Sequence, residues 1–438
     1  MRAHLMGICG SGMSALAAWM AHRGHEVSGC DRDPSAEPWL ADLGIHVETG
    51  HSPAHAASCE VLVHTAAVPG DHPELEAGRS SGALVLRRSE ALAWMCPGCR
   101  VAAVAGAHGK TTTTAMTGWV LQYSGVDPTV LAGGKVPGWT GGFRPGGDEV
   151  VLEADEYDRA FLRIPHEAAA VTSFDLEHLE CYGSEEALHS AFQIFLELTA
   201  PGGGVVVPVE NPDLAFWASR IGRRVLSAGP GGDFDCVGRG ASGWGETFDV
   251  AGMTGRLGIP GVHNLRNAAT TLALTSLLGV DARTALDALD GFPGVGRRLE
   301  RLGIRDGRLI VSDYAHHPRE MAASISALRR AMPESRLAVI FEPHLFSRTA
   351  RLGAEMGRAL AEADIAFVLP IYPARESPVP GVDSGLVVSA AVAAGAGCSR
   401  CGPREAVGLA RSIDADVVVF MGAGVSDSLA RLALGDGR

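Results

Sequence analysis

The hydrophobic and polar positions along the chain alternate between short apolar runs and longer segments with helical spacing. Short apolar runs occur at 3–8, 26–30, 61–64, 101–105, 150–153 and 168–172. Between them, apolar residues recur every three or four positions, as at 13–23 and 185–198. Short runs bounded by glycine turns are typical of buried strands, and the longer segments are typical of helices. The repeated order of strand, helix and strand therefore predicts an α/β protein with parallel sheets.

Two breaks rich in proline and glycine divide this pattern into three parts. The first break is the stretch 95–99, and the second is 291–296. Proline and glycine together interrupt both the helical and the strand period, so each break marks a linker. Apolar strands resume after the second break at 309–312, 337–341, 366–369 and 417–421. The pattern predicts three α/β domains, at residues 1–97, 98–294 and 295–438, each with a Rossmann-like or phosphate-loop sheet.

The net charge, the apolar stretches and the cysteines of the chain limit the kinds of molecule that it is expected to bind. The formal net charge of -13 argues against a broad surface for nucleic acid or anionic lipid. The apolar stretch 5–20 is interrupted by glycines and is too short to span a membrane. Nine cysteines, an odd number, occur without a secretory signature and indicate a reducing compartment. These properties favour a cytoplasmic protein that acts on small molecules and does not insert into membranes.

A glycine-rich loop follows the predicted strand 101–105. The loop and the start of the next predicted helix contain Gly106, His108, Gly109, Lys110, Thr111 and Thr112. Backbone N–H groups of such a loop cradle phosphates, while its lysine reaches the terminal phosphate oxygens and its threonine binds Mg²⁺. Only Lys110 and Lys135 are lysines among 37 basic residues, so a compact ammonium is specifically needed here. We predict a nucleoside triphosphate site with Lys110 on an exposed loop, although Val104 occupies the first glycine position of the full motif.

A second glycine motif lies near the N-terminus. It comprises Gly10, Ser11, Gly12, Met13 and Ser14, and Asp31 follows at the end of the next predicted strand. This spacing predicts a diphosphate at a helix N-terminus and a ribose or base near the acid, which NAD(P) and UDP satisfy equally. An NAD(P)-binding oxidoreductase remains an alternative at this point, but it leaves Lys110 unexplained. A nucleotide-binding regulatory protein without catalysis is a third hypothesis.

Polar residues also follow other predicted strands. Glu153 ends the strand 150–153, and His178 comes shortly after the strand 168–172. Carboxylates at a strand end beside a triphosphate suit Mg²⁺, and the histidine can complete such a site. In the third part of the chain, Asp313 and Tyr314 follow one strand, and His344 and Arg348 follow the next. The carboxyl ends of parallel strands bind ligands, and arginine grips a carboxylate with two hydrogen bonds, so we predict an amino-acid site there.

Two pairs of cysteines have the spacing of zinc ligands, Cys96 with Cys99 and Cys398 with Cys401. About 300 residues separate the pairs. A shared site would require the first linker and the third predicted domain to approach each other closely. We therefore expect these cysteines to be reduced thiols without a metal.

Taken in order, the motifs of this chain resemble those of the Mur ligases. The resemblance rests on residues 7–14, 106–114, 153–158, 263–268, 296–298, 313–318, 341–349 and 371–376. It implies an N-terminal UDP-binding domain, a central ATPase domain and a C-terminal domain that closes over the site. It also implies ATP-dependent joining of an amino acid to the carboxylate of UDP-N-acetylmuramate, with Mg²⁺ or Mn²⁺, in a monomer or weak homodimer.

The resemblance implies a role for each matching residue. Lys110 and Thr111 would bind ATP phosphates and Mg²⁺, and Glu153 and His178 would hold metal. The remaining implied contacts are Asn264, Asn267, Arg298 and Asp313 for ATP, Thr65 and Ala66 beside the N-terminal glycine motif for the UDP-sugar, and Tyr314, His344 and Arg348 for the amino acid. These assignments are expectations carried over from the family.

The same resemblance favours the branch that adds L-alanine. Ligases for later residues usually have a carbamylated lysine, and residues 151–200 contain no lysine. A ligase that recycles murein tripeptide is the alternative. Three positions depart from the family's usual residues: Ser173 replaces asparagine, Glu177 replaces aspartate, and Leu345 replaces an arginine that often follows the histidine. Leu345 bears on the acceptor preference, because one carboxylate partner is absent.

Overall fold

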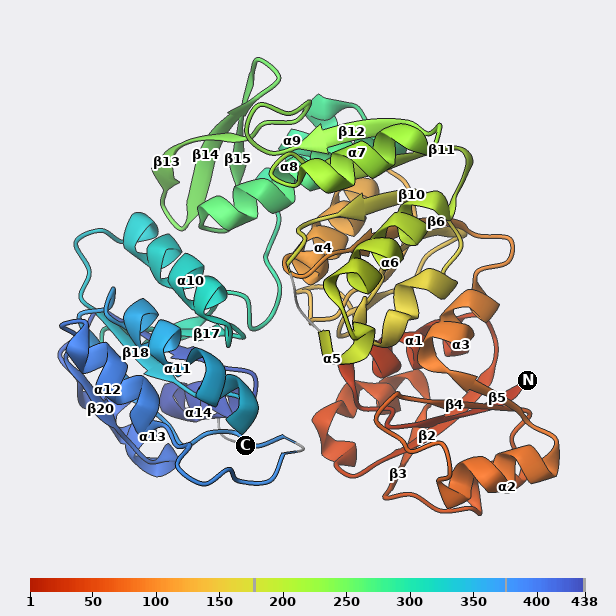
Figure 1. The fold of residues 1–438 in the computed structure, drawn as a ribbon, viewed down its shortest axis with the longest axis horizontal. Helices are drawn as coiled ribbons and strands as arrows, with labels where there is room; N and C mark the ends of the chain where they lie inside the picture. The colour runs from red at the N-terminus through yellow and green to blue at the C-terminus, as the bar shows by residue number, and fades with distance from the viewer. Residues whose placement is uncertain (176–178, 375, 436–438) are drawn as a thin grey trace. The chain divides into compact units, whose positions relative to one another are not determined.

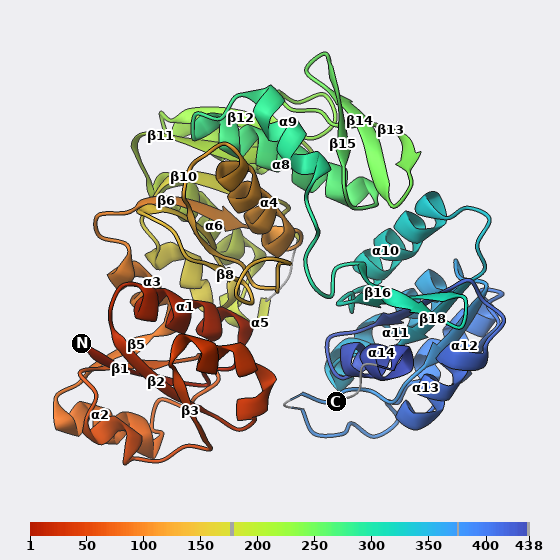
Figure 2. The ribbon, with the colours of Figure 1, turned by 180° about the vertical axis from the view of Figure 1, so that it is seen from behind.

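A computed structural model describes residues 1–175, 179–374 and 376–435. It contains three sheets covered by helices, together with a small three-stranded sheet (Figures 1 and 2). The expected α/β class with mainly parallel sheets is confirmed. No helix within the described ranges combines the length and hydropathy needed to cross a bilayer.

The N-terminal sheet has five parallel strands in the order β3-β2-β1-β4-β5. Its strands are β1 (Arg2–Met6), β2 (Glu26–Asp31), β3 (His46–Thr49), β4 (Val61–His64) and β5 (Leu84–Arg87). The helices α1 (Ser11–His22) and α3 (Arg88–Met95) cover one face, and α2 (Pro73–Ser81) with the short helix η3 (His55–Ala57) covers the other (Figure 1). Chain order reverses between β1 and β4, which is the point where sheets of this kind bind ligands.

Side chains of β1 alternate between these two faces. Ala3 and Leu5 pack in the core beneath α1, whereas Met6 joins a smaller core under α2. His4 lies on the same face as Met6, because successive strand residues point to opposite sides. The face under α2 therefore contains polar side chains inside an apolar layer.

The central sheet has seven strands in the order β12-β11-β10-β6-β9-β7-β8. Its strands are β6 (Arg100–Ala105), β7 (Thr129–Leu131), β8 (Phe143–Arg144), β9 (Glu149–Glu153), β10 (His166–Val171), β11 (Thr199–Pro208) and β12 (Arg224–Ala228). The helices α6 (Glu185–Glu197) and α7 (Pro212–Arg220) pack on one face. Helix α4 (Lys110–Tyr123) packs on β9 and β7 and against α9 (Ala282–Asp290). Strand β6 lies in the interior of the sheet, so the loop that follows it starts from a rigid base.

A three-stranded sheet follows the central sheet in the chain. It consists of β13 (Val237–Ser242), β14 (Gly245–Val250) and β15 (Met253–Leu257). The chain then enters α8 (Val262–Leu277), a helix of 16 residues. The glycine-rich stretch 227–245 contains parts of β12, β13 and β14.

The C-terminal sheet has the order β16-β17-β21-β18-β19-β20. Its strands are β16 (Glu300–Arg305), β17 (Arg308–Asp313), β18 (Leu337–Phe341), β19 (Ile365–Val368), β20 (Cys398–Arg400) and β21 (Val417–Met421), with β16 antiparallel to β17. One face packs on α10 (Pro318–Ala331), α11 (Phe346–Leu360) and α12 (Gly385–Ala393). The other packs on α13 (Pro403–Ser412) and α14 (Ser426–Leu434) (Figure 2).

The chain forms two compact units. The first contains Met1–Val237, Asp249–Gly255 and Arg266–Phe292, and the second contains Gly238–Phe248, Arg256–Leu265 and Pro293–Arg438. The first unit includes both glycine motifs, and the second includes the predicted amino-acid site. The domain boundaries 97/98 and 294/295 stay predictions.

Candidate active site

The N-terminal glycine motif forms a tight turn between β1 and α1. Gly7 has φ +76, and a Cβ there would lie 2.8 Å from the side chain of Thr65, which follows β4. Gly10 precedes α1 and supplies no side-chain cap. The Met13 N–H donates to the Gly10 carbonyl at 2.8 Å. The N–H groups of Ser11 and Gly12, at the very start of the helix, therefore point to an anion site, as a helix N-terminus favours. The turn, Thr65 and Ala66 thus meet where the chain order of the sheet reverses.

Asp31 lies beside this turn and hydrogen-bonds to the backbone. One carboxylate oxygen accepts from the Cys9 N–H at 2.9 Å, and the other accepts from the Asp33 N–H at 3.3 Å. These bonds hold the glycine turn and the end of β2 together. A contact between Asp31 and a ribose stays a prediction.

Arg88, at the start of α3, is a candidate that the sequence reasoning missed. A Cβ on Gly12 would lie 2.3 Å from Nη1 of Arg88, so the guanidinium lies against the start of α1. Its Nη2 lies 3.3 Å from Oδ2 of Asp155, which follows β9. A guanidinium beside open N–H groups suits a diphosphate. No local motif marks Arg88, since only the fold brings it to Gly12.

The second glycine loop is fixed by residues that follow β10. Gly106 has φ +127, and a Cβ there would lie 2.4 Å from Oγ1 of Thr172. The His108 N–H donates to Oγ of Ser173 at 2.8 Å, and the Ala107 N–H donates to its carbonyl at 3.1 Å. Ser173, one of the positions that depart from the family's usual residue, thus supports the loop from outside through these two hydrogen bonds.

Lys110 opens α4 and lies inside the loop. Its Nζ donates to the Gly106 carbonyl at 2.6 Å and to both carboxylate oxygens of Glu156 at 3.0 and 2.9 Å. The side chains of Lys110 and Glu156 are 13% and 4% exposed, so the expected exposed position of Lys110 is wrong. Burial by itself would lower the Lys110 pKa, but the carboxylates of Glu156, Asp155 and Glu153 outweigh it and raise that pKa. The ammonium therefore stays charged at neutral pH.

Glu156 was not among the expected site residues, although it belongs to the same acidic stretch as Glu153. Glu153 itself lies on the other side of the loop. Its Oε2 accepts from the hydroxyl of Thr111 at 2.9 Å and from the Gly133 N–H at 2.8 Å. A threonine hydroxyl beside a carboxylate is a donor set that fits Mg²⁺ next to phosphate oxygens. His178, the other expected metal ligand, lies outside the described residues.

Two more expected residues contribute to the loop region. A Cβ on Gly109 would lie 2.3 Å from Oδ1 of Asn267, so this α8 side chain lies against the loop. Thr112 is buried in the first turn of α4. Thus Asn267, Thr111 and Glu153 all approach the loop at Lys110 within the first unit.

In the second unit, Asp313 and Asn264 hydrogen-bond to their own surroundings. Asp313 is buried, and its carboxylate accepts from the N–H groups of Leu299 and Ala315, both at 2.8 Å. Burial raises the Asp313 pKa, and these hydrogen bonds oppose that rise. The Asn264 amide donates to the Pro260 carbonyl at 2.7 Å. Nucleotide contacts by Asp313, Asn264 and Arg298 stay predictions.

The residues predicted to bind the amino acid lie next to one another, where strands β17 and β18 of the C-terminal sheet end. The rings of Tyr314 and His316 lie 5.4 Å apart, and those of His316 and His344 lie 5.6 Å apart. Nη1 of Arg348 lies 3.1 Å from Nδ1 of His344, which requires that this nitrogen accepts the hydrogen bond. The guanidinium of Arg298 lies 5.1 Å from the centre of the Tyr314 ring. The structure thus brings the three predicted side chains, Tyr314, His344 and Arg348, into one region at the C-terminal sheet together with His316 and Arg298.

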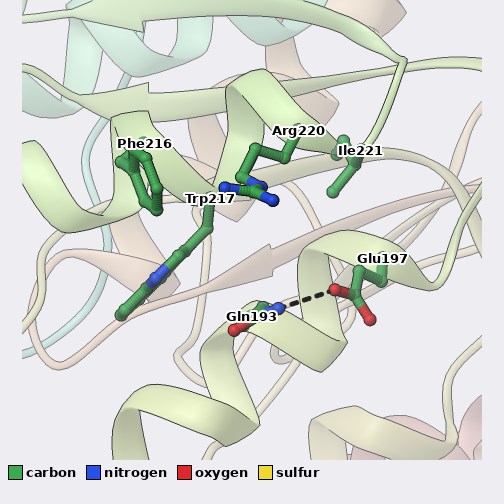
Figure 3. A pocket seen from close by; sticks show the side chains of 6 residues that line it. All are labelled: Gln193, Glu197, Phe216, Trp217, Arg220 and Ile221. Atoms are coloured by element: carbon green, nitrogen blue, oxygen red, sulfur yellow. Dashed lines mark hydrogen bonds between the residues drawn. The ribbon is translucent and has the colours of Figure 1, made fainter.

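A separate pocket of about 520 Å³ lies between α6 and α7 (Figure 3). It is lined by Gln193, Glu197, Phe216, Trp217, Arg220 and Ile221. None of these residues belongs to a glycine loop or to an expected site. The Gln193 side chain donates a hydrogen bond to Glu197, one turn further along α6, at 2.9 Å. We assign this pocket no part in the chemistry.

The fold and these sites define an α/β protein with one glycine loop at the start of α1 and another at the start of α4, the second beside a lysine, a threonine and two carboxylates. Residues 2–98, 104–275 and 297–424 match, respectively, the Mur ligase family catalytic domain, the Mur ligase middle domain and the Mur ligase glutamate ligase domain. The chain belongs to the Mur ligase family, and it is therefore an enzyme of the ligase class.

Similar proteins cover nearly the whole chain. The UDP-N-acetylmuramate–L-alanine ligase of Streptomyces griseus is 39% identical, over 97% of this chain and 94% of that protein. The ligase of the same name from Streptomyces coelicolor is 40% identical, over 97% and 95%. The crystal structure of UDP-N-acetylmuramate–alanine ligase from Thermotoga maritima has a TM-score of 0.87 at 26% identity, covering 100% of this chain and 99% of that one.

Proposed function

We propose that this enzyme joins L-alanine to the carboxylate of UDP-N-acetylmuramate, using ATP, in the synthesis of peptidoglycan precursors. The observation that carries the proposal is the loop at Lys110, where a buried ammonium lies on one side and the Thr111–Glu153 pair lies on the other. Similarity over nearly the full length to ligases named for these two substrates supports the choice of acceptor and donor.

A carboxylate resists attack by an amine, because oxide is a very poor leaving group. Transfer of the γ-phosphoryl group of ATP to a carboxylate oxygen forms an acyl phosphate and releases ADP. The amine of alanine then attacks the carbonyl carbon, phosphate leaves, and the amine loses a proton. The Lys110 ammonium offsets the repulsion between the carboxylate and the triphosphate, so that the two anions can approach each other.

Mg²⁺ would be held by Thr111, Glu153 and His178, and when bound it would neutralise phosphate charge. Backbone N–H groups of residues 106–112 would bind the phosphates of ATP, with Asn264, Asn267, Arg298 and Asp313 as further contacts. The turn at 10–14, with Asp31, Thr65 and Ala66, would bind the UDP-sugar, and Arg88 would join them.

Tyr314, His344 and Arg348 would bind alanine, with Arg348 pairing with its carboxylate. We assign the domains to residues 1–97, 98–294 and 295–438, in the order UDP-sugar, ATP and amino acid. The enzyme would act in the cytoplasm, in keeping with nine unpaired cysteines, as a monomer or weak homodimer.

The direct test measures phosphate release from Mg·ATP in the presence of UDP-N-acetylmuramate and one acceptor at a time. We expect release that needs the sugar nucleotide and is fastest with L-alanine among L-alanine, L-serine, glycine and the murein tripeptide. Arg348→Ala should raise the KM for alanine. Fastest release with the tripeptide would show that the tripeptide, and not L-alanine, is the acceptor. Release that does not depend on UDP-N-acetylmuramate would refute the proposal.

A further inference from the structure

A cluster of potential metal ligands lies under α2, on the face of the N-terminal sheet opposite to α1. It consists of His4 on β1, Cys30 on β2, His55 in η3 and Glu74 on α2, and one ligand atom from each lies within 4.8 Å of the others. The Glu74 side chain is fully buried and His4 is 2% exposed. None of these four residues takes part in the function proposed above.

We propose that these four residues bind one Zn²⁺ or a similar divalent transition metal. Zinc with four protein ligands prefers a tetrahedron of nitrogen, sulfur and oxygen donors, whose ligand atoms are roughly 3.3–3.6 Å apart. Oε1 of Glu74 lies 3.3 Å from Nε2 of His4, 3.1 Å from Nδ1 of His55 and 3.5 Å from Sγ of Cys30. These distances already approach the edges of such a tetrahedron.

The orientation of His4 is a separate observation that points to a ligand. Its Nε2 is buried and points toward Glu74, whose Oε1 lies 3.3 Å away, and buried polar atoms are nearly always paired in this way or bound to a ligand. Its other nitrogen, Nδ1, lies 2.9 Å from the hydroxyl of Ser28. A metal at the centre of the cluster would satisfy Nε2.

His55 shows the same arrangement. Its Nδ1 lies 3.1 Å from Glu74, while its Nε2 lies 3.1 Å from a carboxylate oxygen of Glu48. Histidines that bind metals typically give their second nitrogen to a carboxylate, hydroxyl or carbonyl, which fixes the ring and strengthens the ligand. Both histidines of the cluster therefore have an outer partner already in place.

Charge and residue type favour zinc over calcium or magnesium. A thiolate and a carboxylate would together balance the two charges of the ion, so the buried site would be neutral. Imidazole and thiolate ligands suit zinc, whereas calcium and magnesium prefer oxygen ligands only. Four protein ligands leave no position for substrate, so the site would be structural and would tie β1, β2, η3 and α2 together.

The test is titration of the chelator-treated, full-length protein with CoCl₂ in excess MgCl₂. We expect one equivalent of Co²⁺ to produce a thiolate-to-cobalt charge-transfer band, since magnesium occupies the site at Thr111 and that site has no sulfur. ZnCl₂ should displace the cobalt and remain bound after desalting at one zinc per chain. Absence of the band in the unaltered protein would overturn the proposal.

Matched variants locate the site. Cys30→Ala should abolish the band, whereas Cys59→Ala, a neighbouring cysteine outside the cluster, should leave it unchanged. Glu48→Gln alters only the outer partner of His55 and should weaken binding about 10- to 100-fold. His46→Ala, an exposed histidine on β3, should not weaken it. A band that survives in Cys30→Ala would place the metal elsewhere and refute the proposal. If Cys30→Ala does not fold, the cobalt titrations of the unaltered protein and of Glu48→Gln still test the proposal.

Discussion

Lys110 and Lys135 are the only lysines of the chain, and their side chains differ strongly in exposure to solvent. The Lys110 side chain is only 13% exposed and pairs with buried Glu156, whereas that of Lys135 is 59% exposed and lies 3.2 Å from Glu37. Removal of one partner from a buried ion pair leaves an uncompensated charge, but an exposed pair contributes little. The two residues therefore allow a matched comparison of function and stability.

Lys110→Met should abolish phosphate release and also destabilise the protein by about 3 kcal/mol, because Glu156 remains buried without its partner. The double variant Lys110→Met/Glu156→Gln should regain most of that stability and stay inactive. Thermal unfolding and phosphate release measure the two effects.

Lys135→Met is the control, and both its activity and its stability should stay close to those of the unaltered protein. Activity in the double variant would show that the ammonium is not needed for phosphoryl transfer.

His166 is a buried histidine whose two ring nitrogens are both engaged. Nδ1 lies 2.9 Å from the Ile164 carbonyl, to which it donates, and Nε2 lies 3.2 Å from the Thr199 hydroxyl, from which it accepts. Burial lowers the His166 pKa, because the protonated ring would lose solvation, and the carbonyl opposes this only in part. Below pH 6.5 the unfolded chain binds this proton more readily than the folded one, so stability falls as pH falls.

The His166→Gln variant retains a donor and an acceptor but does not titrate. It should be less stable than the unaltered protein at pH 7.5, and this difference should shrink as the pH falls to 5.5, because only the unaltered protein loses stability through this histidine. Unfolding in urea at both pH values measures the change. A difference that stays constant with pH would contradict the neutral state of His166.

At the scale of elements, the apolar runs predicted strands well where the signal is local. Strands β4, β18 and β21 coincide with the apolar runs at 61–64, 337–341 and 417–421. By contrast, β11 was missed, because Gly202 to Gly204 have no side chains to form a pattern and leave only the short apolar run Val205 to Val207. That strand exists because β10 and β12 supply hydrogen-bonding partners on both sides, which a local pattern does not record.

The same limit applied to the candidate site. The loop motif predicted Lys110 and Thr111, since its spacing is contained in one short segment. Ser173, Glu156 and Arg88 reach the two glycine loops from other strands and helices. Glu156 lies in the acidic stretch that the sequence singled out, but its pairing with Lys110 depends on the fold, and nothing in the neighbourhood of Arg88 marks it.

Helix α4 has a glycine with positive φ at each end, and the two can be compared. Gly109 has φ +83 and no room for a Cβ, which would lie 2.3 Å from Asn267, whereas Gly125 has φ +87 and open space. Gly125→Ala should cost about 1 kcal/mol from backbone strain alone and keep full activity. Gly109→Ala should lose at least 100-fold in kcat/KM for ATP, because the loop must move away from Asn267.

Steady-state kinetics and thermal unfolding of both variants test this comparison. Equal losses of stability with full activity in both would show that the loop tolerates displacement, and that its close contact with Asn267 is not needed.

At the scale of the whole molecule, one buried carboxylate connects the three-stranded sheet to α10 within the second unit. Glu246 on β14 is fully buried, and its oxygens accept from Nε and Nη2 of Arg330 at 3.1 and 3.0 Å. Glu246 also accepts from the Gly261 N–H at 3.3 Å. The pair joins segments about 80 residues apart in the chain, so no sequence pattern predicted it.

Arg330→Gln should destabilise the protein by about 2–3 kcal/mol, because Glu246 loses its charged partner while it stays buried. The double variant Arg330→Met/Glu246→Leu should recover much of this loss. Arg336→Gln, which breaks the exposed pair with Asp414, should cost less than about 1 kcal/mol. Denaturant unfolding compares the three, and equal costs for Arg330→Gln and Arg336→Gln would contradict the structural role of Glu246.

The scarcity of lysine has a consequence for measuring motion in this enzyme. A protease that cleaves only after lysine has two sites in the whole chain, one at exposed Lys135 and one at the Lys110–Thr111 bond at the start of α4. The second bond can be cut only after the phosphate loop has opened, because Lys110 is buried there. The rate of that single cut therefore reports local unfolding of the loop without any label. Bound nucleotide should slow the cut in proportion to the decrease in the population of open loops.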